Sequence, residues 1–351
     1  MNTTPPLALP SLILVLMLAM PAGSSSSFPV PAPIAPAVDD TTDYELLVDT
    51  IEKLLHQHLY SMEAFEHPRT QALIIDLRKA ARQDSDREAF VNLARSHAQR
   101  LPYTHFRLTP PQNAQQAQQT SENLEANQGR WNHMKLSWHG EDVAILSIDL
   151  FLLELDDVKE AFEEIAAREA QALILDLRGN MGGTYSSGYV GAHLLDEPSN
   201  VGVLFARPVR DLVLSAEWSG LPQPAVQDIE SVDHLVELLT TSGGIVLNVR
   251  PSEPHFSGPV YVLTDRGTGS ASEPLVEALQ RTGRATVVGE PTTGAMLSGH
   301  DFDAGQGWTV TIPVFDFVTQ EGKRLDKVGV APDELVPAEE ALEHVLERIG
   351  S

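Results

Sequence analysis

Two apolar runs that each end in a turn of small residues constrain the fold of this chain most. The first, ALILDLR at 172–178, meets GNMGG, and the second, GPVYVLTD at 258–265, breaks into RGTGSAS. Short, continuously apolar runs are typical of fully buried strands. Each turn leads into a sequence that favours a helix, at 186–196 and at 272–282. Strands that alternate with helices predict an α/β fold built in layers.

The same alternation of strand-like and helix-like segments continues over most of the chain after residue 130. We expect a β-hairpin at 134–151 that turns at His139 and Gly140. The remaining elements that we expect are strands at 201–209 and 284–290, paired short strands at 307–319, and helices at 157–170 and 338–350.

One eight-residue segment occurs twice with a single difference. QALIIDLR at 71–78 continues into KAARQ, whose residues favour a helix, whereas QALILDLR at 171–178 stops at GNMGG. From these flanks alone we predict a helix for the first copy and a strand for the second. Eight shared residues do not indicate a domain repeat.

The N-terminal residues resemble a secretory signal. Leu12–Met20 is an apolar run followed by small residues, which predicts a signal peptide over 1–23. The run is shorter than the roughly 20 residues that span a bilayer, so we expect no stable membrane insertion after signal cleavage. The chain has no cysteine. A cysteine-free exported protein fits a bacterial periplasmic or secreted location better than an animal secretory pathway.

Composition divides the rest of the chain into segments. Three helical patterns, at 44–60, 67–82 and 84–100, indicate a small helical unit, and Asp84 and Ser85 are N-cap candidates for the third. The expected segments are a Pro/Ser-rich linker (24–42), an N-terminal helical domain (43–109), a Gln-rich linker or loop (110–130) and an α/β domain (131–351).

The net charge of −25 argues against some partners. Such an acidic surface repels phosphate backbones, so we expect no nucleic-acid partner. Nothing demands a metal or a cofactor. His56 and His58 are two residues apart in a predicted helix and therefore point apart. Gly267 and Gly269 lack the third glycine of a dinucleotide-binding loop.

Ser270 and Ser272 lie where a predicted strand gives way to a helix. Backbone N–H groups at a helix start are unpaired and can stabilise a developing oxyanion. Both serines could instead be caps, and Ser270 with Glu273 matches a capping box. Pro274 disfavours helical geometry at Glu273. We therefore expect the helix to begin late, with Ser272 at its cap and Ser270 available as a nucleophile.

Four motifs, in order, resemble those of the tail-specific, or C-terminal processing, serine protease family. They are DLRGNMGG (176–183), GTGSASE (267–273), GRATVVGE (283–290) and GVAPD (329–333). The resemblance covers 171–333, about half of the chain. It implies a crotonase/ClpP-like layered β-α core, a protease-like catalytic domain over 131–351, and no PDZ insert before Met134.

The commonest branch of that family uses a lysine base 25 residues after its serine. Position 295 is Ala here, and no lysine lies between Lys159 and Lys323. The chain therefore lacks a Ser–Lys dyad at this place. It is more similar to the branch of the tricorn protease core and the interphotoreceptor retinoid-binding protein modules, whose proteases use a histidine base.

The resemblance to this branch implies a role for each candidate residue. Ser270 would be the nucleophile and His105 the base, with Thr104 as the neighbouring hydroxyl. Asp326, where the branch has Glu, would orient the base and stabilise its charge. The N–H of Ala271, with that of Gly182 or Gly183, would form the oxyanion hole.

Other interpretations stay open at this stage. His300 is a rival base, while Arg178 and Asp176 are expected to hold the turn after their strand. The implied function is an exported serine endopeptidase acting on a peptide or unfolded protein substrate. The alternatives are a catalytically idle relative that binds hydrophobic ligands or peptides in the same cleft, and an interaction module with an acidic face. The sequence predicts no oligomeric state and leaves the segment 205–258 without a place in the fold.

Overall fold

The computed structural model describes residues 42–83, 86–111 and 133–350. The expected signal peptide (1–23) lies outside these residues, as do the linker at 24–42 except Thr42 and most of the Gln-rich segment at 110–130. These assignments, and the domain boundaries drawn from them, stay predictions.

A six-stranded sheet forms the centre of the α/β part, as the alternating pattern predicts. The order is β11-β8-β7-β4-β3-β2, with β2 antiparallel to β3 and the other neighbours parallel. The expected hairpin at 134–151 is β2 and β3, with His139 paired to Val143 across its turn. The strands are β2 (Met134–His139), β3 (Val143–Ile148), β4 (Ala172–Asp176), β7 (Val260–Thr264), β8 (Ala285–Gly289) and β11 (Glu334–Leu335).

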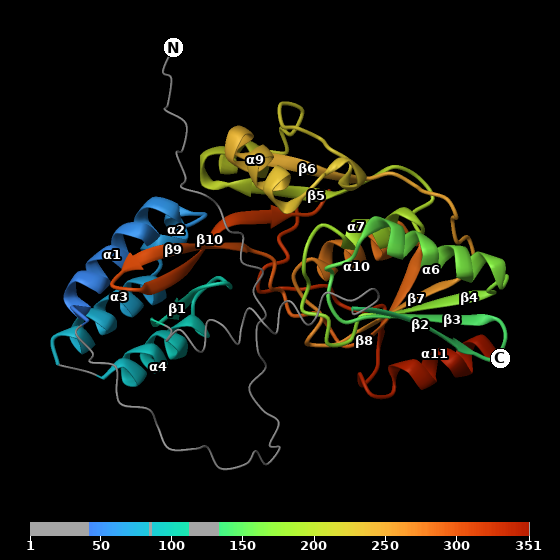
Figure 1. Cartoon of the computed structure of the whole chain (residues 1–351), viewed down its shortest axis with the longest axis horizontal. Helices are drawn as coiled ribbons and strands as arrows, with labels where there is room; N and C mark the ends of the chain where they lie inside the picture. The colour runs from blue at the N-terminus through green and yellow to red at the C-terminus, as the bar shows by residue number, and fades with distance from the viewer. Residues whose placement is uncertain (1–41, 84–85, 112–132, 351) are drawn as a thin grey trace.

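Helices cover both faces of this sheet (Figure 1). One face is covered by α6 (Leu155–Ala167), α7 (Ser187–Ala192) and α10 (Ser272–Arg281), whose apolar residues share one core with the strands. The other face is covered by α11 (Ala341–Gly350), which packs Ala341 and Val345 onto it. Because both faces are covered, β4 and β7 are almost wholly apolar, as is usual for parallel strands.

The expected late start of the helix after β7 is wrong. α10 begins at Ser272, two residues before Pro274, and Ser272 is not its cap. A proline in the first turn of a helix is tolerated because its missing N–H would have no partner there anyway.

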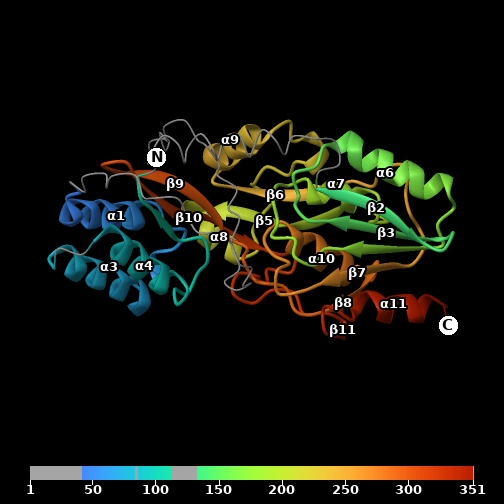
Figure 2. The same ribbon diagram turned by 60° about the horizontal axis from the view of Figure 1, so that its bottom comes forward.

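A second sheet is arranged around one long strand (Figure 2). β10 is continuous from Trp308 to Val318, so the expectation of paired short strands at 307–319 is wrong. Its antiparallel partners are β9 along most of its length, β1 at one end and β5 at the other. The strands are β1 (Arg107–Thr109), β5 (Ser199–Ala206), β6 (Gly244–Val249), β9 (Ser298–Gly305) and β10 (Trp308–Val318).

The segment 205–258 belongs to this second sheet. It contains β6, which pairs with β5, and the helices α8 (Arg210–Leu214) and α9 (Val232–Ser242), with short 3₁₀ turns at Arg207–Val209 and Val226–Asp228. α9 packs on β6 and β5 through Leu235, Val236 and Leu239. The strand expected at 201–209 ends at Ala206, where the first 3₁₀ turn begins.

In the described part of the chain, β1 is preceded by the helices α1 (Tyr44–His58), α2 (Met62–Glu66), α3 (Pro68–Ala81) and α4 (Arg87–Ala98). Asp86 caps α4 by accepting from the N–H of Ala89, and the cap candidates Asp84 and Ser85 lie outside the described residues. The helices share a core with the far part of β9 and β10, where Trp308 is fully buried. The helical unit is therefore anchored to strands that lie two hundred residues later in the chain.

The two copies of the repeated octapeptide fold as expected. Residues 71–78 lie within α3, while residues 172–176 of the second copy form β4.

Trp308 is the residue that we expect to matter most for joining the helices to the second sheet. Its ring lies 6.0 Å from the rings of both Tyr44 and Phe90, measured between centroids. Trp308→Ala should lower the free energy of unfolding by about 3–5 kcal/mol because it leaves a cavity in this core. Urea unfolding would measure the change. Ile75→Ala, at an exposed position of α3, is the control and should change it by less than about 0.5 kcal/mol.

Candidate active site

The turns after β4 and β7 lie against each other at the carboxyl ends of two neighbouring parallel strands. The N–H of Gly269 donates to the carbonyl of Asn180 at 2.9 Å. Gly182 has a φ of +105°, and a Cβ on it would overlap Ser270 Cβ and lie 2.8 Å from the amide nitrogen of Ala271. Only glycine fits this close approach, which explains why the first turn has a glycine at position 182.

The structure distinguishes the two candidate serines. The hydroxyl of Ser272 is buried and donates to Oδ1 of Asn180 at 3.0 Å, so it ties the two turns together. The hydroxyl of Ser270 makes no hydrogen bond with any residue that the structure describes. Ser270 also has a left-handed backbone with φ of 52°. Strained backbone of this kind concentrates at functional sites.

Two amide groups beside Ser270 are available to a ligand. Within the described ranges, neither the N–H of Ala271 nor that of Gly183 has a protein acceptor. The N–H of Gly182 donates to Oδ1 of Asn180 at 2.8 Å, and that of Ser270 donates to Glu273 at 3.0 Å. Of the two glycines proposed for an oxyanion hole, Gly183 is therefore the one with a free donor.

His105 is held by Thr104 and Asp326 just before β1. The hydroxyl of Thr104 donates to Oδ1 of Asp326 at 2.6 Å and lies 2.7 Å from Nδ1 of His105. A hydroxyl has one proton, and Thr104 gives it to Asp326, so Thr104 must accept from Nδ1–H of the ring. Nδ1 then carries the proton and Nε2 keeps its lone pair, as a general base requires.

Asp326 therefore contacts His105 through a hydroxyl. No ion pair joins Asp326 directly to His105 among the described residues. Asp326 is buried and also accepts from the N–H of Met296 at 3.1 Å. Burial raises the pKa of Asp326, while the hydrogen bond from Thr104 and the charge of Arg324 oppose that rise. Its Oδ2 is buried without a hydrogen-bond partner.

His105 itself is neutral at physiological pH. Burial and, secondarily, the positive charge of Lys327 lower the pKa of His105 to about 4. Like Ser270, His105 has a left-handed backbone, with φ of 62°.

One segment, 293–299, contacts both groups of candidate residues. A Cβ on Gly269, next to Ser270, would lie 3.2 Å from Thr293 and 3.7 Å from Cβ of Ala295. A Cβ on Gly299 would lie 3.5 Å from Cβ of His105. No hydrogen bond joins Ser270 to His105 in the described part of the chain, and the segment 293–299 is what connects the two groups.

The remaining sequence candidates differ in their surroundings, and Nδ1 of His300 is buried without a hydrogen-bond partner among the described residues. The ring of His300 packs edge-on against Phe302, 4.6 Å between centroids, and burial lowers its pKa. Arg178 donates to both carboxylate oxygens of Asp176 at 2.8 and 2.6 Å and to the carbonyl of Ala338. This pair therefore fastens the turn after β4 to the chain before α11.

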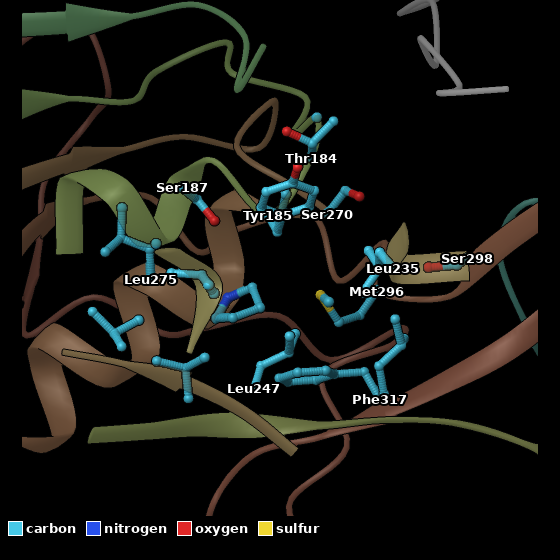
Figure 3. A pocket seen from close by; sticks show the side chains of 18 of the residues that line it. Thr184, Tyr185, Ser187, Leu235, Leu247, Ser270, Leu275, Met296, Ser298 and Phe317 are labelled. Carbon is cyan, nitrogen blue, oxygen red and sulfur yellow. The ribbon is translucent and has the colours of Figure 1, made fainter. Parts of the chain in front are cut away.

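An apolar pocket opens beside Ser270 (Figure 3). Its volume is about 120 Å³, and none of its lining residues is charged. Ser270, Thr184 and Tyr185 lie at one side, with Leu247 and Phe317 across from them. Sequence reasoning missed this pocket, because five of its lining residues come from the unplaced segment: Val226, Val232, Leu235, Leu247 and Val249.

The described residues contain neither a cluster of metal-ligating side chains nor a helix that could span a membrane. No three His, Asp or Glu side chains lie close enough together to hold a metal ion. No helix there has the length and apolar character needed to cross a membrane.

Comparisons with known proteins agree with the motifs. A family model described as Peptidase family S41 matches residues 142–336. The "C-terminal processing peptidase, chloroplastic" of Tetradesmus obliquus is 30% identical over 198 residues, which cover 55% of this chain and 35% of that protein. The match thus spans about a third of that relative's length.

Two solved structures share the fold. A putative peptidase from Parabacteroides merdae has a TM-score of 0.60 at 15% identity, covering 88% of this chain and 96% of that one. The photosystem II D1 C-terminal processing protease has a TM-score of 0.51 at 16% identity, covering 89% and 98%. At these identities the likeness concerns the fold alone. The family match over more than half of the chain, together with the four motifs, establishes that this chain belongs to peptidase family S41.

Proposed function

We propose that this chain is an exported serine endopeptidase that hydrolyses peptide bonds in unfolded or C-terminal peptide segments. The observation that carries the proposal is the Thr104 hydroxyl, which bonds Asp326 and His105 at once and leaves Nε2 of the ring free. Family membership and the names of the relatives, which are C-terminal processing peptidases, support the substrate class. The N-terminal sequence 1–23 supports export to the periplasm or the medium of a bacterium.

The first half of the reaction forms an acyl-enzyme. Oγ of Ser270 attacks the peptide carbonyl carbon while Nε2 of His105 takes the hydroxyl proton. The carbonyl oxygen becomes negative and accepts from the N–H groups of Ala271 and Gly183. The C–N bond then breaks, and the leaving amine takes the proton from His105.

The second half returns the enzyme to its starting state. Water gives a proton to Nε2 of His105 and attacks the ester carbon, and the ester bond to Ser270 breaks as the serine oxygen regains that proton. Asp326, acting through Thr104, stabilises the positive imidazole ring in both halves. Ser270 and His105 need to approach only when substrate is bound, since catalytic hydrogen bonds are often long in free enzymes.

Digestion of unstructured peptides would test the activity directly. Mature protein from about residue 24 should cleave them, with products read by mass spectrometry. Ser270→Ala and His105→Ala should each lower kcat by at least about 10³-fold, because both groups act in every bond-making step. Cleavage near the full rate by His105→Ala would contradict its role and point to His300. A folded wild-type protein that cleaves nothing would favour the idle, ligand-binding alternative.

The lowered pKa of His105 predicts the pH profile of the reaction. A base works only when deprotonated, so kcat/KM should fall as the pH drops through about 4, well below the 6.5 of an ordinary histidine. Lys327→Gln removes a positive charge that lowers this pKa, and should move the acid limb to higher pH. Lys323→Gln, at an exposed turn, is the control. A wild-type limb near 6.5, unmoved by Lys327→Gln, would contradict this assignment.

The pocket beside Ser270 predicts the preferred side chain before the cut bond. An uncharged apolar cavity of about 120 Å³ should accept leucine-sized side chains and reject charged ones. Leu235→Ala enlarges the pocket and should shift the preference toward aromatic residues by about tenfold in kcat/KM. Leu239→Ala is the matched control on the same helix, because Leu239 is buried there but does not line the pocket. Equal shifts in both variants would exclude the pocket as the specificity site.

A further inference from the structure

Glu273 carries a carboxylate that is completely buried behind Ser270. It has no basic side chain as an ion-pair partner in the ranges that the structure describes. Instead it accepts four hydrogen bonds, one from a hydroxyl and three from backbone N–H groups. Burial raises the pKa of Glu273, and all four bonds oppose the rise. Burying a carboxylate without a cation is costly, and only the four hydrogen bonds offset that cost here.

The four donors come from both sides of the candidate site. Oε2 accepts from the N–H of Ser270 at 3.0 Å and from that of Ala295 at 2.9 Å. Oε1 accepts from Oγ1 of Thr292 at 2.6 Å and from the N–H of Gly294 at 2.8 Å. One carboxylate thus joins the backbone of the nucleophile to the segment that leads toward His105.

The network continues to the loop that bears the acid. Oγ1 of Thr292 accepts from the N–H of Val330 at 2.7 Å, and the N–H of Lys327 donates to the carbonyl of Gly294 at 2.7 Å. The loop 325–330, which includes Asp326, is therefore fixed to the same segment that Glu273 holds.

We propose that Glu273 is a positioning residue, whose carboxylate holds Ser270 in its left-handed conformation and keeps the nucleophile in register with the segment 292–295. The inference rests on the proposed peptidase function. The N–H of Ser270 is bound to Glu273 and cannot also donate to the oxyanion. The oxyanion is therefore stabilised by the N–H groups of Ala271 and Gly183.

The hydrogen bonds require a carboxylate. Each oxygen of Glu273 faces at least one backbone N–H, which can only donate. In Glu273→Gln the amide nitrogen must face either the N–H groups of Ser270 and Ala295 or that of Gly294, so one donor always meets another donor. The change is nearly isosteric, and it therefore disturbs the hydrogen bonds while leaving the packing in place.

The closing experiment compares Glu273→Gln with Glu277→Gln. Glu277 lies one turn later on α10, is also buried and pairs with Arg281 at 3.3 Å, away from Ser270. Glu273→Gln should lower kcat by about 100-fold, the scale of a misplacement of about 1 Å, while KM changes less than about threefold. Hydrogen exchange should become faster at the amides of Ser270 and Ala295. Glu277→Gln should change neither quantity.

The two readouts separate this inference from the proposed function. Unchanged exchange at Ser270 and Ala295 in Glu273→Gln would overturn the positioning role, whether or not the protein cleaves peptides. Faster exchange with an unchanged kcat in an active enzyme would overturn its importance for catalysis. Failure of the wild-type protein to cleave any peptide would count against the peptidase proposal, while the exchange data would still decide what Glu273 holds.

Discussion

The pairing of β1 with β10 is the constraint on which the candidate site depends. β1 begins two residues after His105, and its register places Arg107 opposite Thr311. β10 continues from there to its pairing with β5, where Phe317 lines the pocket beside Ser270. A single strand of eleven residues thus relates the helical unit to the turns of the main sheet. Had β10 been broken into short strands, this continuous backbone link between His105 and the pocket would be lost.

The Thr104 hydroxyl is the link between Asp326 and His105. It bonds the carboxylate at 2.6 Å and lies 2.7 Å from Nδ1 of the ring, so it transmits orientation from the acid to the ring. It also selects the ring tautomer, because an ionised Asp326 can only accept. The arrangement therefore depends on Thr104 as much as on the acid.

The sequence predicted the elements with strong local patterns and failed where distant contacts decide. The helix and strand conformations of the two octapeptides could be predicted because different residues follow them, KAARQ after the first and GNMGG after the second. The start of α10 was predicted wrongly, because Pro274 favours a later start while the buried hydrogen bonds of Glu273 hold that residue in the first turn. The pocket could not be predicted from the sequence, because its walls come from strands and helices that meet only in the folded chain.

The same distinction applies to the two serines. Local rules made Ser272 the cap and left Ser270 as the candidate nucleophile. The cap assignment is wrong, and the contacts that distinguish the two serines are ones that no local rule contains. Ser272 is occupied by Asn180, 92 residues away, whereas the conformation of Ser270 is maintained by Glu273. Left-handed backbone at a non-glycine residue costs about 1–3 kcal/mol and persists only where neighbours enforce it. A serine held in such a conformation with its hydroxyl unbound is what the proposed role of Ser270 as nucleophile requires.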